Sequence, residues 1–158
     1  MKRILTLWLV LGAMYITIEV LWRGYTHPSM LVVGGICGVL VGLINQTPMF
    51  YRSPIAVQAV IGACIVLVVE FIAGCILNIW LGLNVWDYSE SFGNIMGQVC
   101  VTYAFLWVLL MPLAIWAEDT SRWLIYSWEK LLGREPGPQP IYPPYTVKSV
   151  YKDFFTGK

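Results

Sequence analysis

Two glutamates stand out because each lies inside a long apolar run. Glu19 and Glu70 are the only carboxylates between Ile4 and Phe71. An ionised side chain in a membrane-crossing helix costs roughly 2.5–3.5 kcal/mol on insertion. Such a carboxylate either fixes helix packing through hydrogen bonds or binds a solute, an ion or a proton, and both interpretations stay open for Glu70. For Glu19, a local ion pair with Arg23 is an alternative explanation.

Helical spacing places further polar residues beside these glutamates. Glu70, Gly74 and Asn78 are four residues apart and therefore share one helix face, as do Glu19 and Arg23. Gly74 should open space beside Glu70, and Arg23 should pair with Glu19, or with Glu70 if the helices adjoin. We expect a polar cluster between helices in the outer half of a membrane. Its members would be Glu19, Arg23, Glu70, Asn78, Trp86, Asp87, Tyr88, Asn94 and Gln98.

The connection that carries Trp86, Asp87 and Tyr88 is rich in aromatic residues. A short loop of this composition is expected to fold back onto the membrane surface or to re-enter it partly. Asp87 could cap a turn by accepting backbone N–H bonds. The alternative is that Trp86, Asp87 and Tyr88 form the rim of a ligand site.

No catalytic or metal-binding set accompanies these residues. The chain has a single histidine, His27, and no Ser–His or Cys–His pattern accompanies it. We therefore expect no enzymatic activity, no cofactor and no metal ion. The cysteines lie inside apolar runs and are interpreted as small buried side chains; they are Cys37, Cys64, Cys75 and Cys100.

Composition defines the environment in which these residues act. Of 158 residues, 58% are hydrophobic and 12% charged, and the net charge is +1. Soluble domains are about half apolar and about a quarter charged. Only six charged residues lie between Ile4 and Ala117. This pattern excludes a soluble enzyme, a nucleic-acid binder and a disordered chain, and it predicts a polytopic membrane protein.

The apolar runs predict an all-α integral membrane domain over residues 1–117. A spanning helix needs roughly 20 mostly apolar residues, and no signal-peptide cleavage site follows the first run. Counted by connection, nine Lys and Arg fall on the side of both termini and one on the other. Both termini are therefore expected in the cytoplasm. The four expected transmembrane helices are 4–22, 29–50, 54–80 and 95–117.

Two segments follow the apolar domain. Residues 118–132 are expected to form either an amphipathic helix on the inner membrane surface or an extension of the fourth span. Residues 133–158 are expected to form a proline-rich cytoplasmic tail.

Glycines repeat every four residues on the second expected span. Gly34, Gly38 and Gly42 form two overlapping GxxxG motifs. Such a row lets another helix approach closely, and a partner helix in the same chain is favoured over one in a second copy.

The segment from Glu70 to Cys100 resembles the ABC-transporter type IV family. It contains Glu70, then Trp86-Asp-Tyr-Ser89, then Asn94-x-x-Gly-x-Val-Cys100. The resemblance covers residues 15–117 and implies a small multi-pass membrane protein of bacteria and prophages with a permease-like role. The chain lacks a GxxxxGK[ST] phosphate loop, so an ATPase would be a separate chain.

The resemblance, added to the apolar spans, implies a permease-like or transport-associated subunit of the bacterial inner membrane. Its expected partners are the lipid bilayer and either a separate ATPase or further copies of itself. The alternative is a membrane assembly protein without transport activity, such as a holin-like pore former or an accessory subunit.

Overall fold

The computed structural model describes residues 2–47, 50, 53–141 and 145–157. Arg52 and Lys158, which contributed to the charge count, lie outside these residues. Within the described residues, regular structure is helical, apart from a single bridge between Ile95 and Val99. The elements are α1 Lys2–Arg23, α2 Ser29–Gln46, α3 Ile55–Gly74, the π-helical turn η1 Cys75–Trp80, α4 Val101–Leu131 and α5 Val147–Thr156.

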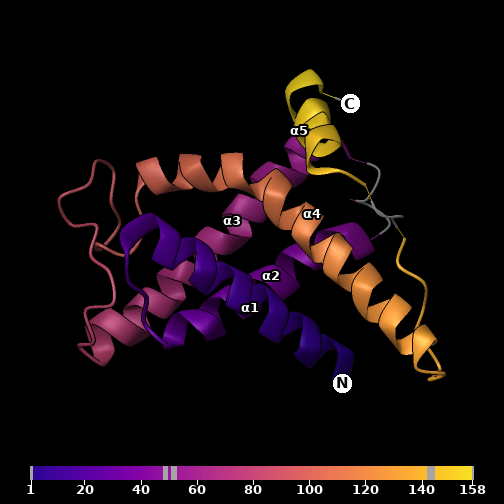
Figure 1. Ribbon diagram of the computed structural model, residues 1–158. Coiled ribbons are helices and arrows are strands. Elements are labelled where there is room, and N and C mark those ends of the chain that lie inside the picture. The colour runs from indigo at the N-terminus through magenta and orange to yellow at the C-terminus, as the bar shows by residue number, and fades with distance from the viewer. Residues whose placement is uncertain (1, 48–49, 51–52, 142–144, 158) are drawn as a thin grey trace.

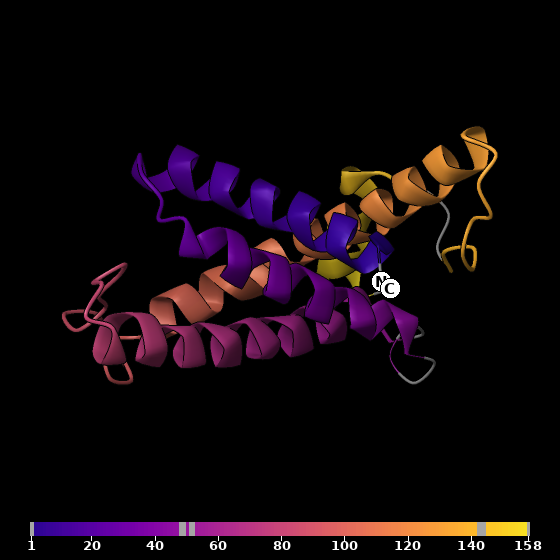
Figure 2. The same cartoon turned by 90° about the horizontal axis from the view of Figure 1, so that it is seen from below.

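The helices α1, α2 and α3 and the first part of α4 lie side by side (Figures 1 and 2). The α1–α2 connection and the loop before α4 lie at one end, and the start of α1 lies at the other. Three described segments are long and apolar enough to cross a membrane: Arg3–Arg23, Ile55–Trp80 and Val101–Leu131. The apolar part of α2, Ser29–Ile44, is shorter. The expected all-helical architecture is thus confirmed, whereas the described residues give three helices of spanning length and not the expected four.

Glycines allow the close approach of α1 to α2. A Cβ atom on Gly34 would lie 2.5 Å from Tyr15, and one on Gly38 would lie 2.7 Å from Leu11. The glycines permit this contact because the side chains of Tyr15 and Leu11 lie directly against the glycine backbone of α2. The glycine row therefore packs within the chain, as the sequence favoured. Gly42 continues the row but faces α4, where its Cβ would lie 2.0 Å from a carboxylate oxygen of Glu118.

The ends of the helices differ from those expected. The last long helix begins at Val101 instead of residue 95, because Met96 and Gly97 have φ values of 53° and 70°. Such positive values are incompatible with a right-handed helix. The third expected span changes to π-helix after Gly74. α4 continues without interruption to Leu131, so residues 118–131 extend the fourth helix.

The tail is not entirely extended. Residues 147–156 form α5, which the sequence analysis did not predict. Thr146 caps the helix by accepting a hydrogen bond from the Ser149 N–H, and Gly157 ends it in a left-handed conformation. Both residues are common boundary signals for a helix. The helix between them was overlooked because the proline-rich stretch before it led the whole tail to be treated as one segment.

Candidate functional site

Asn78 organises the loop before α4. It lies in η1, where the wider π turn displaces the chain from α-helical register. Its side-chain amide donates to the carbonyl of Trp86 at 2.9 Å and to Oε1 of Gln98 at 2.8 Å. Its Oδ1 accepts from the N–H of Val85 at 2.7 Å. The Asn78 side chain thus hydrogen-bonds both to the start of the loop, at Val85 and Trp86, and to its end, at Gln98. This agrees with the expected polar cluster.

Gln98 and Trp86 complete this network. Gln98 is 5% exposed, and its amide donates to the carbonyl of Met96 at 2.8 Å. The Trp86 indole donates to the carbonyl of Gln98 at 2.9 Å. Gly74 makes room for Gln98, because a Cβ there would lie 2.3 Å from Oε1. We expected Gly74 to open space beside Glu70. The structure instead places Gln98 against Gly74, one turn after Glu70 on α3.

The Trp86-Asp87-Tyr88 stretch does not converge on a ligand rim. Trp86 is buried, whereas Asp87 is exposed. The ring of Tyr88 stacks on Tyr103 with centroids 4.5 Å apart, and burial raises the pKa of the Tyr88 hydroxyl. These three neighbouring side chains therefore have different surroundings and do not face one common cavity.

Asp87 and Asn94 shape the exposed turns of the loop. Asp87 Oδ1 accepts from the N–H of Ser89 at 2.9 Å and from its hydroxyl at 2.5 Å. These bonds hold the pKa of Asp87 below its usual value. Asn94 donates to the carbonyls of Ser89 and Ser91 and accepts from the Gly97 N–H. Both residues act as turn caps, as one interpretation of the sequence held for Asp87.

Glu19 and Arg23 form the expected ion pair, with 2.6 Å between Oε1 and Nη2. The hydroxyl of Thr26 donates to the other oxygen of Glu19. Arg23 also reaches the loop, where Nη1 donates to the carbonyl of Val85 at 3.5 Å. The pair therefore joins the end of α1 to the loop before α4, and its charges are balanced locally.

Glu70 is held differently. It is 6% exposed, and Oε2 accepts a 2.9 Å hydrogen bond from the indole of Trp107. The Trp107 ring is stacked with Tyr15, with centroids 6.0 Å apart. Among the described residues, Lys, Arg and His make no ion pair with Glu70. A buried carboxylate with a neutral partner can gain or lose a charge without breaking an ion pair.

The sequence analysis missed two buried acids on α4. Glu118 is 1% exposed and Asp119 is 4% exposed. Glu118 forms an ion pair with Arg122, four residues later on the same helix. Asp119 accepts a 2.5 Å hydrogen bond from the Tyr145 hydroxyl. The burial of Glu118 could have been predicted from its spacing to Met111 and Ile115. These three residues share one helix face, which continues past the expected end of the span.

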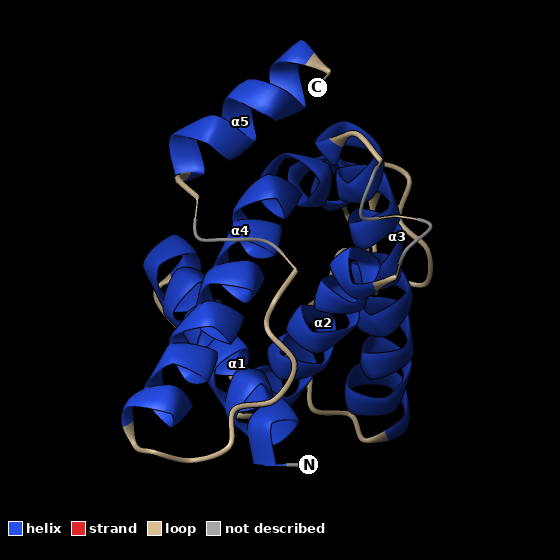
Figure 3. Cartoon of the chain, turned by 90° about the vertical axis from the view of Figure 1, so that its right-hand side faces the viewer, coloured by secondary structure: helices blue, strands red, loops and turns tan. Residues whose placement is uncertain are grey.

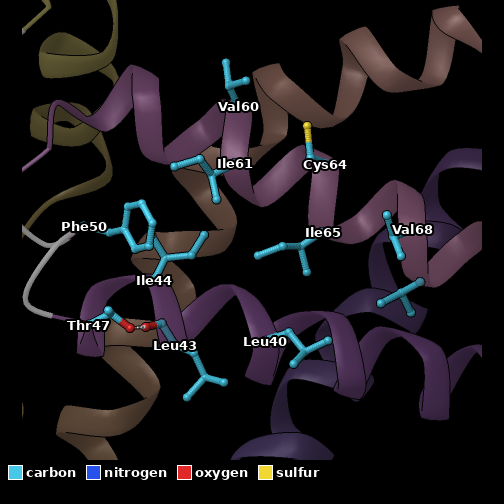
Figure 4. Close-up of a pocket in the computed structure, with 11 residues that line it drawn as sticks. Leu40, Leu43, Ile44, Thr47, Phe50, Val60, Ile61, Cys64, Ile65 and Val68 are labelled. Carbon is cyan, nitrogen blue, oxygen red and sulfur yellow. Dashed lines mark hydrogen bonds between the residues drawn. The ribbon is translucent and has the colours of Figure 1, made fainter.

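An apolar groove lies away from these polar residues, between α2 and α3 (Figure 4). Its volume is about 620 Å³, and no ionisable carboxylate or amine lines it. The hydroxyl of Thr47 is satisfied by the carbonyl of Leu43 at 2.8 Å. The groove is suited to hydrocarbon, since it offers no polar group to orient a polar ligand.

The described residues were also considered as metal ligands. In the parts of the chain that the structure describes, no three side chains among His, Cys, Asp and Glu are grouped so that they could hold a metal ion. All the cysteines are free thiols. Cys37 and Cys100 are buried as expected, whereas Cys64 is exposed and Cys75 is half-buried, so the interpretation of all of them as buried side chains is wrong for these two.

Comparison with known proteins supplies the family. The model of the family described as "Putative ABC-transporter type IV" matches residues 6–130, which is most of the chain. The protein belongs to this family. No curated protein and no solved structure matches the chain. Together with its long apolar helices, the family makes this chain a membrane protein associated with transport.

Proposed function

We propose that the protein is a permease-like subunit whose polar site in the outer half of the membrane centres on Glu70. The observation that carries the proposal is the burial of this carboxylate between α3 and α4, where the Trp107 indole is its only hydrogen-bond donor among the described residues. A carboxylate kept at this depth for packing alone would be expected to have a cationic partner, as Glu19 has.

The proposal includes four membrane crossings in a bacterial inner membrane. In addition to the three longer helices, the shorter α2 would also cross the membrane. The loop before α4 would lie in the outer interface or partly re-enter. The excess of Lys and Arg on the side of both termini supports their cytoplasmic placement. The hydrogen bonds of Asn78 support a loop that is folded rather than loose.

A separate ATPase is the proposed energy source. The chain has no phosphate loop of its own, and the family name refers to ABC transport. The holin-like alternative drew on the glycine row as an oligomer contact. That row is occupied within the chain by Tyr15 and Leu11, so the structure gives this alternative no specific support.

The first experiment is affinity purification from native membranes in mild detergent, followed by identification of the co-purifying chains. An ATPase is the expected partner. The complex would then be tested in proteoliposomes for ATP-driven flux of substrate or protons. Glu70→Gln should keep the complex assembled but abolish flux, whereas Glu90→Gln in the exposed loop should retain it. Normal flux in Glu70→Gln would remove this residue from the site.

Topology is tested by cysteine labelling in a chain with Cys64 replaced by alanine. Phe92→Cys, in the loop before α4, should react with an impermeant maleimide in intact cells, because Phe92 is 83% exposed. Trp128→Cys, near the end of α4, should react only after permeabilisation. The reverse pattern would invert the proposed orientation.

A further inference from the structure

The C-terminal helix α5 is docked on the membrane domain, outside the bundle of the other helices (Figure 3). Val150 is 4% exposed, and Phe154 packs against the hydrophobic core. The opposite face is open, with Phe155 73% exposed. The family match ends at residue 130, so this helix lies outside the matched region.

The segment before α5 is fixed to the second half of α4. The Trp116 indole donates to the carbonyl of Tyr145 at 2.9 Å. The Tyr145 hydroxyl donates to Asp119, which is buried. These contacts fasten the start of the docked segment one to two turns after Pro112.

The helix α5 itself is fixed to the first half of α4. Pro112 has no N–H to donate to the carbonyl of Val108, and its ring displaces that carbonyl, which bends a helix. The hydroxyl of Tyr151 donates to the carbonyl of Leu109 in this turn at 3.0 Å. Figure 1 shows α4 changing direction next to α5. The tail therefore holds both sides of the bend.

The bend is close to the proposed site. Trp107 lies two residues before Leu109, in the half of α4 that precedes the bend, and it is the residue that donates to Glu70. Any change in the angle between the halves of α4 must move Trp107 relative to α3 or move the second half of the helix.

We infer that α5 is an intramolecular latch that holds α4 bent at Pro112 and thereby controls the contact between Trp107 and Glu70. The mechanical part of this inference stands on the docking contacts alone. Its regulatory meaning rests on the proposed function of Glu70.

The bend can be measured with spin labels in the full chain. Phe105 and Leu124 are 63% and 65% exposed on opposite sides of Pro112; both would be changed to cysteine after replacement of Cys64 and Cys75 by alanine. Val150→Lys, which places a charge in the buried face of α5, should broaden the distance distribution and lengthen it toward the about 28 Å of a straight helix. Lys152→Gln, on the exposed face, should leave it unchanged.

Tyr151→Phe sharpens the test, because it keeps the ring and removes only the hydroxyl that meets Leu109. It should give a smaller change in the same direction. An unchanged distance in Val150→Lys, with α5 shown to be released by its own spin label at Lys148→Cys, would overturn the latch.

The link to Glu70 is tested separately by carbodiimide modification and peptide mapping. The rate of Glu70 modification should change in Val150→Lys and stay constant in Lys152→Gln. A changed bend with constant Glu70 reactivity would limit α5 to a structural role. Neither result depends on flux, so failure of the proposed transport function would be seen independently in Glu70→Gln.

Discussion

Glu70 and Glu118 are both buried between apolar helices, yet their surroundings differ. Glu70 is hydrogen-bonded to a neutral indole on another helix. Glu118 is paired with Arg122, one turn later on its own helix, and fits against the backbone of Gly42. The comparison separates two uses of a buried acid. Glu118 has a cationic partner on its own helix and joins α4 to α2, whereas Glu70 meets only a neutral hydrogen-bond donor among the described residues.

The largest effect should come from removing the cation beside Glu118. Arg122→Met leaves a buried carboxylate without its partner, which typically costs about 3–5 kcal/mol. Arg23→Met should cost less, because Glu19 keeps the Thr26 hydroxyl and lies nearer the end of its helix. The free energy of unfolding in bicelles would measure both. Equal losses would contradict the distinction between the buried and peripheral pairs.

A loss of intermediate size should follow from Asn78→Ala. This change removes three hydrogen bonds and leaves the buried Val85 N–H without its acceptor. The expected loss is about 2–4 kcal/mol. Asn94→Ala is the matched control, because water can replace its bonds in the more exposed turn. A greater loss of stability in Asn94→Ala would mean that the exposed turn, and not Asn78 in η1, stabilises the loop most.

The indole contact to Glu70 should contribute less. Trp107→Phe keeps an aromatic ring beside Tyr15 and removes the donor, at an expected cost of about 1–3 kcal/mol. Trp123→Phe is the control, since the buried Trp123 indole has no hydrogen-bond acceptor among the described residues. Thermal unfolding in detergent should separate the variants. Similar melting temperatures would mean that the Glu70 bond adds no stability.

The smallest effect should be a local pH dependence at Asp87, the exposed counterpart of the buried acids. Its pKa in the folded loop is lowered by the hydroxyl and N–H of Ser89. The stabilisation is therefore complete above the unfolded pKa and is lost as the pH falls through the folded value. The protection of the Ser89 amide against hydrogen exchange, relative to the intrinsic rate at each pH, should fall on acidification. Asp87→Asn should remove this dependence.

Several elements of the site could be predicted from the sequence because their causes are local. The Glu19–Arg23 pair and the Glu118–Arg122 pair both follow from i, i+4 spacing. The turn cap at Asp87 needs only the residues that follow it. The family match bears out the resemblance carried by residues 70–100.

Other elements depended on contacts between distant segments. Spacing could not reveal that Gly74 accommodates Gln98 or that Glu118 meets Gly42, because these contacts join different helices. Nor could it place Tyr151 on Leu109, 42 residues away. The positive φ values at Met96 and Gly97, which delay the start of α4, occur in the loop that Asn78 joins to η1 through Gln98.

The sequence by itself determined the class of this protein: apolar runs long enough to cross a membrane, a marked asymmetry of basic residues, and the residues that identify the family. Hydropathy and charge act residue by residue, so they can be read without a fold. Tertiary structure alone decided which acids are buried with a cation and which are not. It also decided that the tail reaches back to the bend in α4, since burial and hydrogen bonding are properties of neighbours in space.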